Sequence, residues 1–147
     1  MFTLNKIISI LDQKKKPLKE LKYILERYDG KGIDKFKEFD DNKYKKNLIY
    51  RNENYEIFLI CWKKNQFSGI HNHSDNGCLY KVLEGQLSEF LYDSCTLNLK
   101  ESSNLNNETL GYIDDGIGYH KVGNESKEKA MSIHIYSPPH FIPINFN

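Results

Sequence analysis

The sequence predicts an all-β core, an antiparallel sandwich or barrel, preceded by a short annex of helices. Two patterns predict this fold class. The first part of the chain carries apolar side chains at helical spacing, whereas the part after Tyr44 consists of short segments rich in aromatic and branched residues. Turn-forming residues separate these segments, and no helical pattern lies between them. Short strands that are joined only by turns are typical of antiparallel sheets that pack or close on themselves.

The helical annex is predicted over residues 1–42. One helix runs from Thr3 to Leu11, where apolar residues share a face and Thr3 can cap the N-terminus. A second helix begins at Pro17, which suits the first helical position, and ends at Gly30. Its apolar stripe consists of Leu18, Leu21, Leu25 and Tyr28. A stripe of this kind is typical of a helix that buries one face.

The β core is predicted over residues 43–139, and a short C-terminal tail follows at 140–147. The predicted strands, which are rich in residues that favour a pleated sheet, are Asn47–Tyr50, Tyr55–Trp62, Cys78–Glu84, Leu87–Tyr92, Thr96–Lys100, Leu110–Asp114 and Ala130–Tyr136. Residues 55–62 are apolar on both faces, so we expect that strand in the centre of a sheet. The length favours one core, and we expect residues 1–147 to form a single domain.

Composition and charge argue against several classes of partner. The formal net charge is +1, and nothing in this balance indicates nucleic acid or an anionic membrane. No apolar run is long enough to span a membrane, and the first residues lack the order of a signal peptide. The chain has only three cysteines, and an odd number cannot all form pairs, so we do not expect a disulfide framework. We therefore expect a cytoplasmic protein, and a compact barrel with its own annex is compatible with a monomer.

The stretch around His71 and His73 carries the chemistry. The two histidines flank Asn72, so on an extended chain they share one face and Asn72 points to the other. His120, within residues 118–122, is the first candidate for a third ligand. A lone His-x-His pair is weak evidence, because paired surface histidines occur. Three histidines on an all-β pattern favour a metal site.

The last predicted strand, at 130–136, separates polar from apolar residues. Ser132, His134 and Tyr136 share one face, and apolar side chains occupy the other. If the polar row faces the barrel interior, its groups need partners, because unpaired buried polar groups are costly. A hydrogen-bonded relay aimed at a site would provide them. The alternative is a row that faces solvent on a one-sided sheet, and this strand taken alone favours that alternative.

Three imidazole ligands leave the identity of the metal open. Zinc would fit, with a bound water made acidic enough for hydrolysis or hydration. Iron(II) would also fit, as a neutral variant of the two-His-one-carboxylate triad with open positions for substrate and oxygen. A site without its own anionic ligand suits a substrate that brings a negative charge, as a thiolate does. Spacing alone does not choose between these metals.

Three motifs, which agree in order and spacing, resemble the cysteine dioxygenase family. The motifs are Leu59–Glu89, Gly118–Asn124 and Met131–Pro139. In the first motif, Cys78 stands where many cupins carry a glutamate ligand. The matching region spans residues 44–139. The resemblance implies a cupin fold, which is a double-stranded β-helix that forms a jelly-roll-like barrel.

The resemblance also implies a role for each matching residue. The implied cofactor is Fe(II), one ion per chain, and its expected ligands are His71, His73 and His120. Cys78 is expected to form the family's thioether cross-link with Tyr136. Ser132 and His134 are expected to orient Tyr136 through hydrogen bonds. Tyr44 matches a family position at the edge of the substrate pocket.

The main departure from the family lies at the substrate carboxylate. The family binds this group with an arginine two residues after the tyrosine, and Lys46 stands there. A lysine is a point charge and lacks the two-pronged grip of a guanidinium, so we expect Lys46 to bind with weaker affinity and looser selectivity. Arg51 is the reserve candidate, although strand alternation places it on the opposite face from Lys46 unless a bulge intervenes.

Two further departures concern the surroundings of the pocket. The aspartate that the family places between its paired histidines is Asn72 here, which we expect to be a minor change. The sequence also stops soon after Pro139, so we expect the pocket to be more open on that side.

The function implied is a non-haem Fe(II)-dependent thiol dioxygenase that oxidises L-cysteine with O2 to cysteine sulfinic acid, within cysteine catabolism and taurine biosynthesis. The nearest alternative is the same chemistry on 3-mercaptopropionate, cysteamine or a peptide N-terminal cysteine. A different metal-dependent cupin, such as a zinc enzyme or an isomerase, is a second class. A binding or storage cupin without catalysis is a third class, against which the row of Ser132, His134 and Tyr136 argues.

Overall fold

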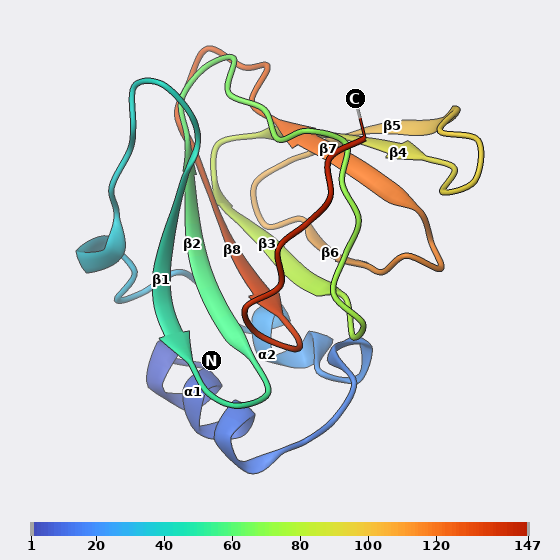
Figure 1. Ribbon diagram of the computed structural model, residues 1–147. Helices are drawn as coiled ribbons and strands as arrows, with labels where there is room; N and C mark the ends of the chain where they lie inside the picture. Colours follow the sequence, from blue (N-terminus) through green and yellow to red (C-terminus); the bar gives the residue numbers. More distant parts are fainter. Residues whose placement is uncertain (1, 147) are drawn as a thin grey trace.

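The computed structural model describes residues 2–146 and consists of short helical segments followed by strands (Figure 1). The helical segments are α1 (Leu4–Gln13), the 3-10 turn η1 (Leu18–Glu20), α2 (Lys22–Glu26) and the 3-10 turn η2 (Asp34–Phe36). The strands are β1 (Lys45–Arg51), β2 (Glu56–Trp62), β3 (Cys78–Glu84), β4 (Leu87–Tyr92), β5 (Leu99–Leu105), β6 (Leu110–Ile113), β7 (Tyr119–Gly123) and β8 (Ala130–Tyr136). No helix in the described part of the chain is long and apolar enough to cross a membrane.

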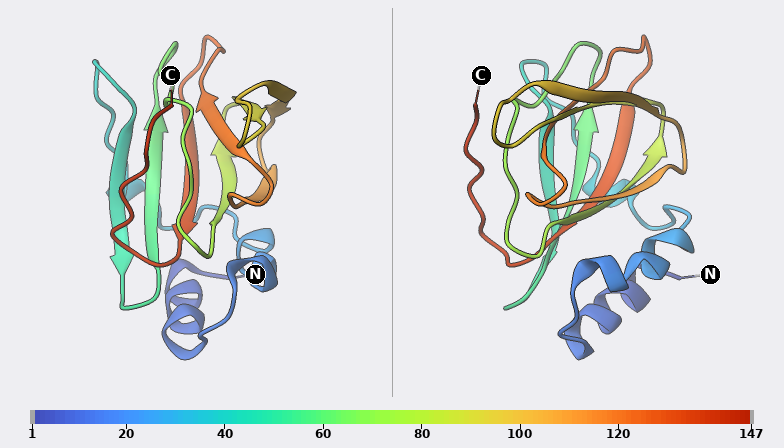
Figure 2. Two further views of the ribbon diagram at one scale, coloured as in Figure 1. Left: turned by 45° about the vertical axis from the view of Figure 1, so that its right-hand side comes forward. Right: turned by 90° about the vertical axis from the view of Figure 1, so that its right-hand side faces the viewer.

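The strands form two antiparallel sheets that curve around a common interior (Figures 1 and 2). The larger sheet has the order β1-β2-β8-β3-β6, and the smaller one has the order β5-β4-β7. Buried side chains from both sheets, among them Ile60, Leu87 and Val122, share one core. As predicted, β2 lies inside the larger sheet, between β1 and β8, where a strand that is apolar on both faces is stable.

The N-terminal helices cover the outer face of the larger sheet at one end (Figure 2). Thr3 caps α1 as predicted, because its hydroxyl accepts a hydrogen bond from the backbone N–H of Lys6 at 3.1 Å. The stripe predicted for the second helix is buried, although Leu21 separates η1 from α2. This stripe packs in one cluster with Ile133 and Ile135 of β8.

A buried lysine fastens the annex to the core. Lys81 of β3 is 6% exposed, and its Nζ donates hydrogen bonds to the carbonyl oxygens of Leu25 at 3.1 Å and Tyr28 at 2.7 Å. These carbonyls lie at and just beyond the C-terminal end of α2, where a cation is favourable to the helix dipole. The ammonium group is therefore buried with partners, which offsets part of its desolvation.

Strand β8 is covered on both sides. Its apolar face packs on the helices, and its polar row faces the barrel interior, where Ser132 is fully buried and His134 is 6% exposed. The alternative in which this row faces solvent on a one-sided sheet is therefore wrong. The annex explains the outcome, since it supplies the second apolar layer that the outer face of β8 needs.

Two strands differ from the prediction. A strand was expected at 96–100 and a loop after it, but β5 begins at Leu99 and continues through the serine-rich stretch to Leu105. Most of β5 is exposed, so no alternation of buried apolar residues marks it in the sequence. β7 was not predicted as a strand, because its five residues form too short a pattern to be recognised.

Candidate metal centre

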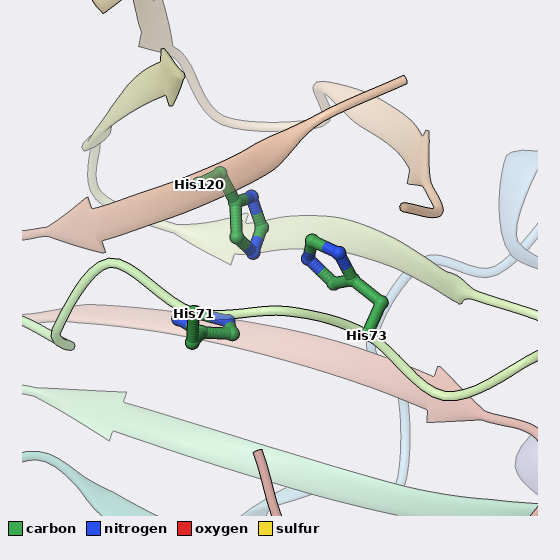
Figure 3. Close-up of side chains that lie close together, drawn as sticks. All are labelled: His71, His73 and His120. Atoms are coloured by element: carbon green, nitrogen blue, oxygen red, sulfur yellow. The ribbon is translucent and has the colours of Figure 1, made fainter. Parts of the chain in front are cut away.

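Three histidines from two segments of the chain meet inside the barrel (Figure 3). His71 and His73 lie on the extended segment between β2 and β3, and His120 lies on β7. The backbones of His71 and His120 form an isolated antiparallel bridge with N···O distances of 3.0 and 3.3 Å. One ligand nitrogen from each ring lies within 4.8 Å of the other two. Three imidazole nitrogens in this arrangement can hold one metal ion.

The paired histidines each have their Nδ1 atom held by an oxygen. The Nδ1 of His71 lies 2.8 Å from the carbonyl oxygen of Gly69, and that of His73 lies 3.1 Å from Asp115 Oδ1. Asp115 Oδ1 also accepts the backbone N–H of His73 at 2.7 Å, which fixes the chain at this ligand. An oxygen acceptor places the ring proton on Nδ1 and leaves the Nε2 lone pair for a metal.

Glu89 of β4 holds the third histidine in the same way. Its Oε2 lies 2.8 Å from His120 Nδ1 and accepts a hydrogen bond from the Tyr80 hydroxyl at 2.8 Å. Burial alone would raise the pKa of Glu89, but the contacts with His120 and Tyr80 hold that pKa below its usual value. Glu89 is therefore a carboxylate, and an anion at Nδ1 makes His120 a more basic metal ligand.

Sequence reasoning assigned no role to Glu89 or Asp115. A signal for Glu89 was present, because Leu87, Glu89 and Leu91 share one face of β4, where Leu87 is in the core and Leu91 packs against it. A charge on an apolar face needs a buried partner. For Asp115, which lies in a turn between β6 and β7, the sequence carried no comparable pattern.

Two further observations show that the three histidines fit a metal. Among residues 2–146, His73 Nε2 is a buried side-chain nitrogen with no hydrogen-bond partner. Burial, with a contribution from His120, lowers the pKa of His71 to about 4 and that of His73 to about 2. Both rings are therefore neutral at neutral pH, which is the form that binds a metal. A metal ion would give the unpartnered nitrogen its partner.

The polar row of β8 forms a chain of contacts that ends at Cys78. Trp62 Nε1 donates to Ser132 Oγ at 3.0 Å, and Ser132 Oγ lies 2.7 Å from His134 Nε2. The other ring nitrogen of His134, Nδ1, is 3.7 Å from Cys78 Sγ. Burial keeps the pKa of His134 well below its usual value, so the ring is neutral.

Cys78 and Tyr136 lie directly opposite each other on β3 and β8. Burial raises the pKa of both the Cys78 thiol and the Tyr136 hydroxyl. Gly77, with φ of 77°, makes the turn before Cys78, and a Cβ there would meet the carbonyl oxygen of Ile113 at 2.5 Å. His134 meets Tyr136 by ring stacking at 6.0 Å, whereas the hydrogen bonds expected from the polar row to Tyr136 lead to Cys78 instead.

A cavity of about 100 Å³ lies beside the histidines. It is smaller than the roughly 300–1,000 Å³ that is usual for drug-sized ligands. Besides the histidines and the Cys78–Tyr136 pair, its lining includes Tyr44, Lys46, Glu56, Ile60, Trp62, Phe141, Pro143 and Asn145. Tyr44 stacks on Trp62 with ring centroids 4.8 Å apart. The C-terminal residues Phe141, Pro143 and Asn145 thus form one side of the pocket, which the sequence did not predict.

Lys46 brings a cation to this pocket. Its side chain reaches solvent, and its Nζ lies 4.5 Å from the ring centroid of Phe58 and 4.9 Å from that of Tyr136. The protein atoms crowded around the ammonium group lower the pKa of Lys46, and the charge of Glu56 opposes this shift. In the part of the chain that the structure describes, Lys46 forms no ion pair. Its charge is therefore available to an anionic substrate.

A β-bulge brings Arg51 to the same face of β1 as Lys46. The register against β2 shifts at residues 48–50, so Lys46 pairs with Ile60 and Arg51 pairs with Glu56. The bulge that alternation alone could not reveal is thus present. Arg51 Nη2 lies 2.7 Å from Oε1 of the buried Glu56, so the charge of Arg51 is already compensated.

Solved structures with the same arrangement of strands identify the fold. A protein of Thermus thermophilus superposes with a TM-score of 0.63 at 19% identity, over 76% of this chain and 98% of that one. A Klebsiella pneumoniae protein described by its double-stranded β-helix domain gives 0.64 at 11% identity, over 79% and 95%. An oxalate decarboxylase of Lactobacillus farciminis gives 0.61 at 13% identity, over 77% and 34%. The predicted cupin double-stranded β-helix is therefore confirmed.

Known sequences identify the family. A family model described as cysteine dioxygenase type I matches residues 2–146. The chain is similar to cysteine dioxygenase type 1 of Danio rerio (36% identity over 132 residues), Rattus norvegicus (34% over 131) and Homo sapiens (33% over 131). Each match covers 83% of this chain and 66% of the relative, so the chain spans just under two thirds of their length. The chain belongs to the cysteine dioxygenase type I family.

Proposed function

We propose that this protein is a non-haem thiol dioxygenase that binds one Fe(II) per chain and oxidises L-cysteine with O2 to cysteine sulfinic acid. The observation that carries the proposal is the three-histidine group, in which acceptors hold each Nδ1 and leave each Nε2 for a metal. Membership of the family favours Fe(II) over zinc. A neutral set of ligands also suits a substrate that brings its own negative charge as a thiolate.

The residues of the chain hold and orient the substrate. When bound, Fe(II) supplies open positions for a thiolate and O2 and takes part in the electron transfer between them. The ammonium group of Lys46 donates to the substrate carboxylate, because the neighbouring Arg51 is already paired with Glu56. The rings of Phe58 and Tyr136 restrict where that ammonium group lies. A substrate bound at its sulfur and at its carboxylate keeps one orientation, which favours a single product.

We also propose that Cys78 and Tyr136 join in a thioether cross-link. The new C–S bond replaces one S–H and one ring C–H bond, and O2, the oxidant, takes up the two hydrogen atoms as H2O2. The direct opposition of the two residues on neighbouring strands supports this step. Trp62, Ser132 and His134 then serve to position the Cys78 sulfur.

The cross-link predicts a mass change. After aerobic turnover, the iron-loaded protein is expected to be lighter by two hydrogen atoms in mass spectrometry, and Cys78→Ser is expected to abolish this loss. Cys95→Ser is the matched control, because Cys95 is exposed and lies in the connection between β4 and β5. A mass loss that persists in Cys78→Ser, or disappears in Cys95→Ser, contradicts the assignment.

A second candidate is the same oxidation of another thiol, such as 3-mercaptopropionate, cysteamine or a peptide N-terminal cysteine. Lys46 favours this candidate, because a lysine offers a less specific grip on a carboxylate than an arginine does. The small cavity argues against the peptide.

The experiment that tests the proposal is oxygen uptake by anaerobically iron-loaded protein, offered L-cysteine, 3-mercaptopropionate and cysteamine in parallel. We expect the highest kcat/KM with L-cysteine. A preference for a thiol without the carboxylate or the amine would move the assignment to the second candidate. Absence of uptake with every thiol, together with tightly held zinc, would exclude both.

A further inference from the structure

The C-terminal segment 141–146 contributes three residues to the lining of the pocket. Figure 2 shows this part of the chain, in dark red, as an extended stretch along one side of the barrel. Its residues alternate as in a strand. Phe141, Pro143 and Asn145 line the cavity, whereas Ile142 and Ile144 are 86% and 58% exposed. The function proposed above does not use this segment, although it forms the wall opposite the interior of the barrel.

The segment is attached to the stretch that carries the paired histidines. The backbone N–H of Phe146 donates to the carbonyl oxygen of Ile70 at 2.8 Å, and Asn145 forms an isolated antiparallel bridge with His71. The ring of Phe146 stacks on Tyr119 at 4.6 Å with an angle of 6° between the planes. The wall therefore rests on residues next to two metal-ligand candidates.

One side chain of the histidine stretch also holds the wall. The Oδ1 atom of Asn72 accepts a hydrogen bond from the backbone N–H of Ile144 at 2.7 Å. Asn72 itself lines the cavity beside His71 and His73, and its amide oxygen reaches the segment from there. The replacement at Asn72 was expected to be minor, and the structure instead gives its amide a contact with a residue 72 positions away.

We propose that Asn72 is a positioning residue that holds segment 141–146 as the outer wall of the pocket, and that this wall limits the size of the thiol that enters. The proposal rests on the function proposed above and adds a size limit to it. The substrate class is a small free thiol of amino-acid size, and a cysteine extended at its carboxylate is disfavoured. Lys46, Pro143 and Asn145 line the same cavity, so we expect an extension from a carboxylate held by Lys46 to meet the wall.

The wall is tested first by amide hydrogen exchange on the anaerobic iron-loaded protein. In Asn72→Ala, the Ile144 amide loses its acceptor, so its exchange reports a local change only. The informative amide is that of Phe146, whose acceptor, Ile70 O, is untouched by the substitution. We expect its exchange to become about fivefold faster, as loss of one hydrogen bond to the wall implies. Asn72→Asp keeps an acceptor and is expected to restore protection.

The size limit is tested by anaerobic binding of L-cysteine and of cysteinylglycine to the same proteins. In Asn72→Ala we expect the dissociation constant of cysteinylglycine, divided by that of L-cysteine, to fall at least threefold. In Asn72→Asp this ratio is expected to stay near the wild-type value. Ile142→Ser is the control, because Ile142 points outward, and it should change neither ratio nor exchange. Unchanged Phe146 exchange or an unchanged ratio in Asn72→Ala overturns the proposal while the proposed function stands. Absence of binding by either thiol to the wild-type protein overturns the proposed function and, with it, the size limit.

Discussion

The inner and outer sides of the pocket are built differently. On the inner side, each histidine has an acceptor at Nδ1, and buried side chains from Trp62 to Cys78 are joined by hydrogen bonds. On the outer side, Lys46 reaches solvent, and segment 141–146 is attached through a few backbone groups and one amide side chain. The comparison suggests that a fixed interior serves the metal chemistry, whereas the exposed side can change and so sets the choice of substrate.

The largest effect should come from removing a metal-ligand candidate. We expect His120→Ala to lower the affinity for Fe(II) by more than about 100-fold, because a lost ligand costs more than the loss of its hydrogen-bond partner. Iron per chain after dialysis and oxygen uptake both measure this. His140→Ala is the control, since His140 is an exposed histidine of the same chain. Equal iron content in the two variants would remove His120 from the site.

A smaller effect is expected from the support of that ligand. Glu89→Gln keeps the size of the side chain and removes the anion at His120 Nδ1. We predict an affinity for Fe(II) about 10–100-fold lower than in the wild type. Glu101→Gln, on the exposed strand β5, is the matched control and should not change the affinity. If Glu89→Gln binds iron as the wild type does, the inner side is less dependent on its hydrogen bonds than we infer.

On the outer side, Lys46→Ala should raise the KM for L-cysteine by about 10-fold, which is the lower range for a hydrogen bond to a charged group. It should leave the KM for cysteamine nearly unchanged, because cysteamine has no carboxylate. Lys45→Ala is the control, since adjacent strand residues point to opposite faces and Lys45 pairs with Cys61. A KM for L-cysteine that does not respond to Lys46→Ala would refute carboxylate binding by this residue.

The smallest effect concerns the stability of the metal-free protein. The folded-state pKa values of His71 (about 4) and His73 (about 2) lie below the value of 6.5 for a free histidine. The unfolded state therefore takes up protons first as the pH falls below 6.5, and stability is lost there. By pH 5.5 each histidine should cost about 1 kcal/mol of the free energy of unfolding. Denaturant titrations at pH 7 and 5.5 measure this loss of stability. A smaller loss in His73→Gln would show that His73 is one of the groups responsible.

The parts of the site that the sequence predicted are local patterns. Alternation of side chains along an extended chain predicts that His71 and His73 share a face. The same rule, applied to β8, predicts the row of Ser132, His134 and Tyr136. The contacts that hold them join different strands, so no spacing in the sequence points to Glu89 at His120. The placing of Arg51 depends on a bulge in β1, which reverses the alternation without a mark in the sequence.

The fold shows the same division. The strand β2, which is buried on both faces, was predicted correctly. The bounds predicted for β5 were wrong, because an exposed strand carries no alternation of apolar residues. The wall at 141–146 was missed because its contacts with Asn72 and Ile70 span about half of the chain. The division into residues 1–42, 43–139 and 140–147 within one domain, the monomeric state and the cytoplasmic location stay predictions.

The most direct test of the proposed function is the product formed by iron-loaded protein from L-cysteine under isotopically labelled O2. We predict cysteine sulfinic acid with both labelled oxygen atoms on sulfur and one O2 consumed for each cysteine. Formation of cystine, incorporation of a single labelled atom, or no consumption of O2 would contradict the proposed function.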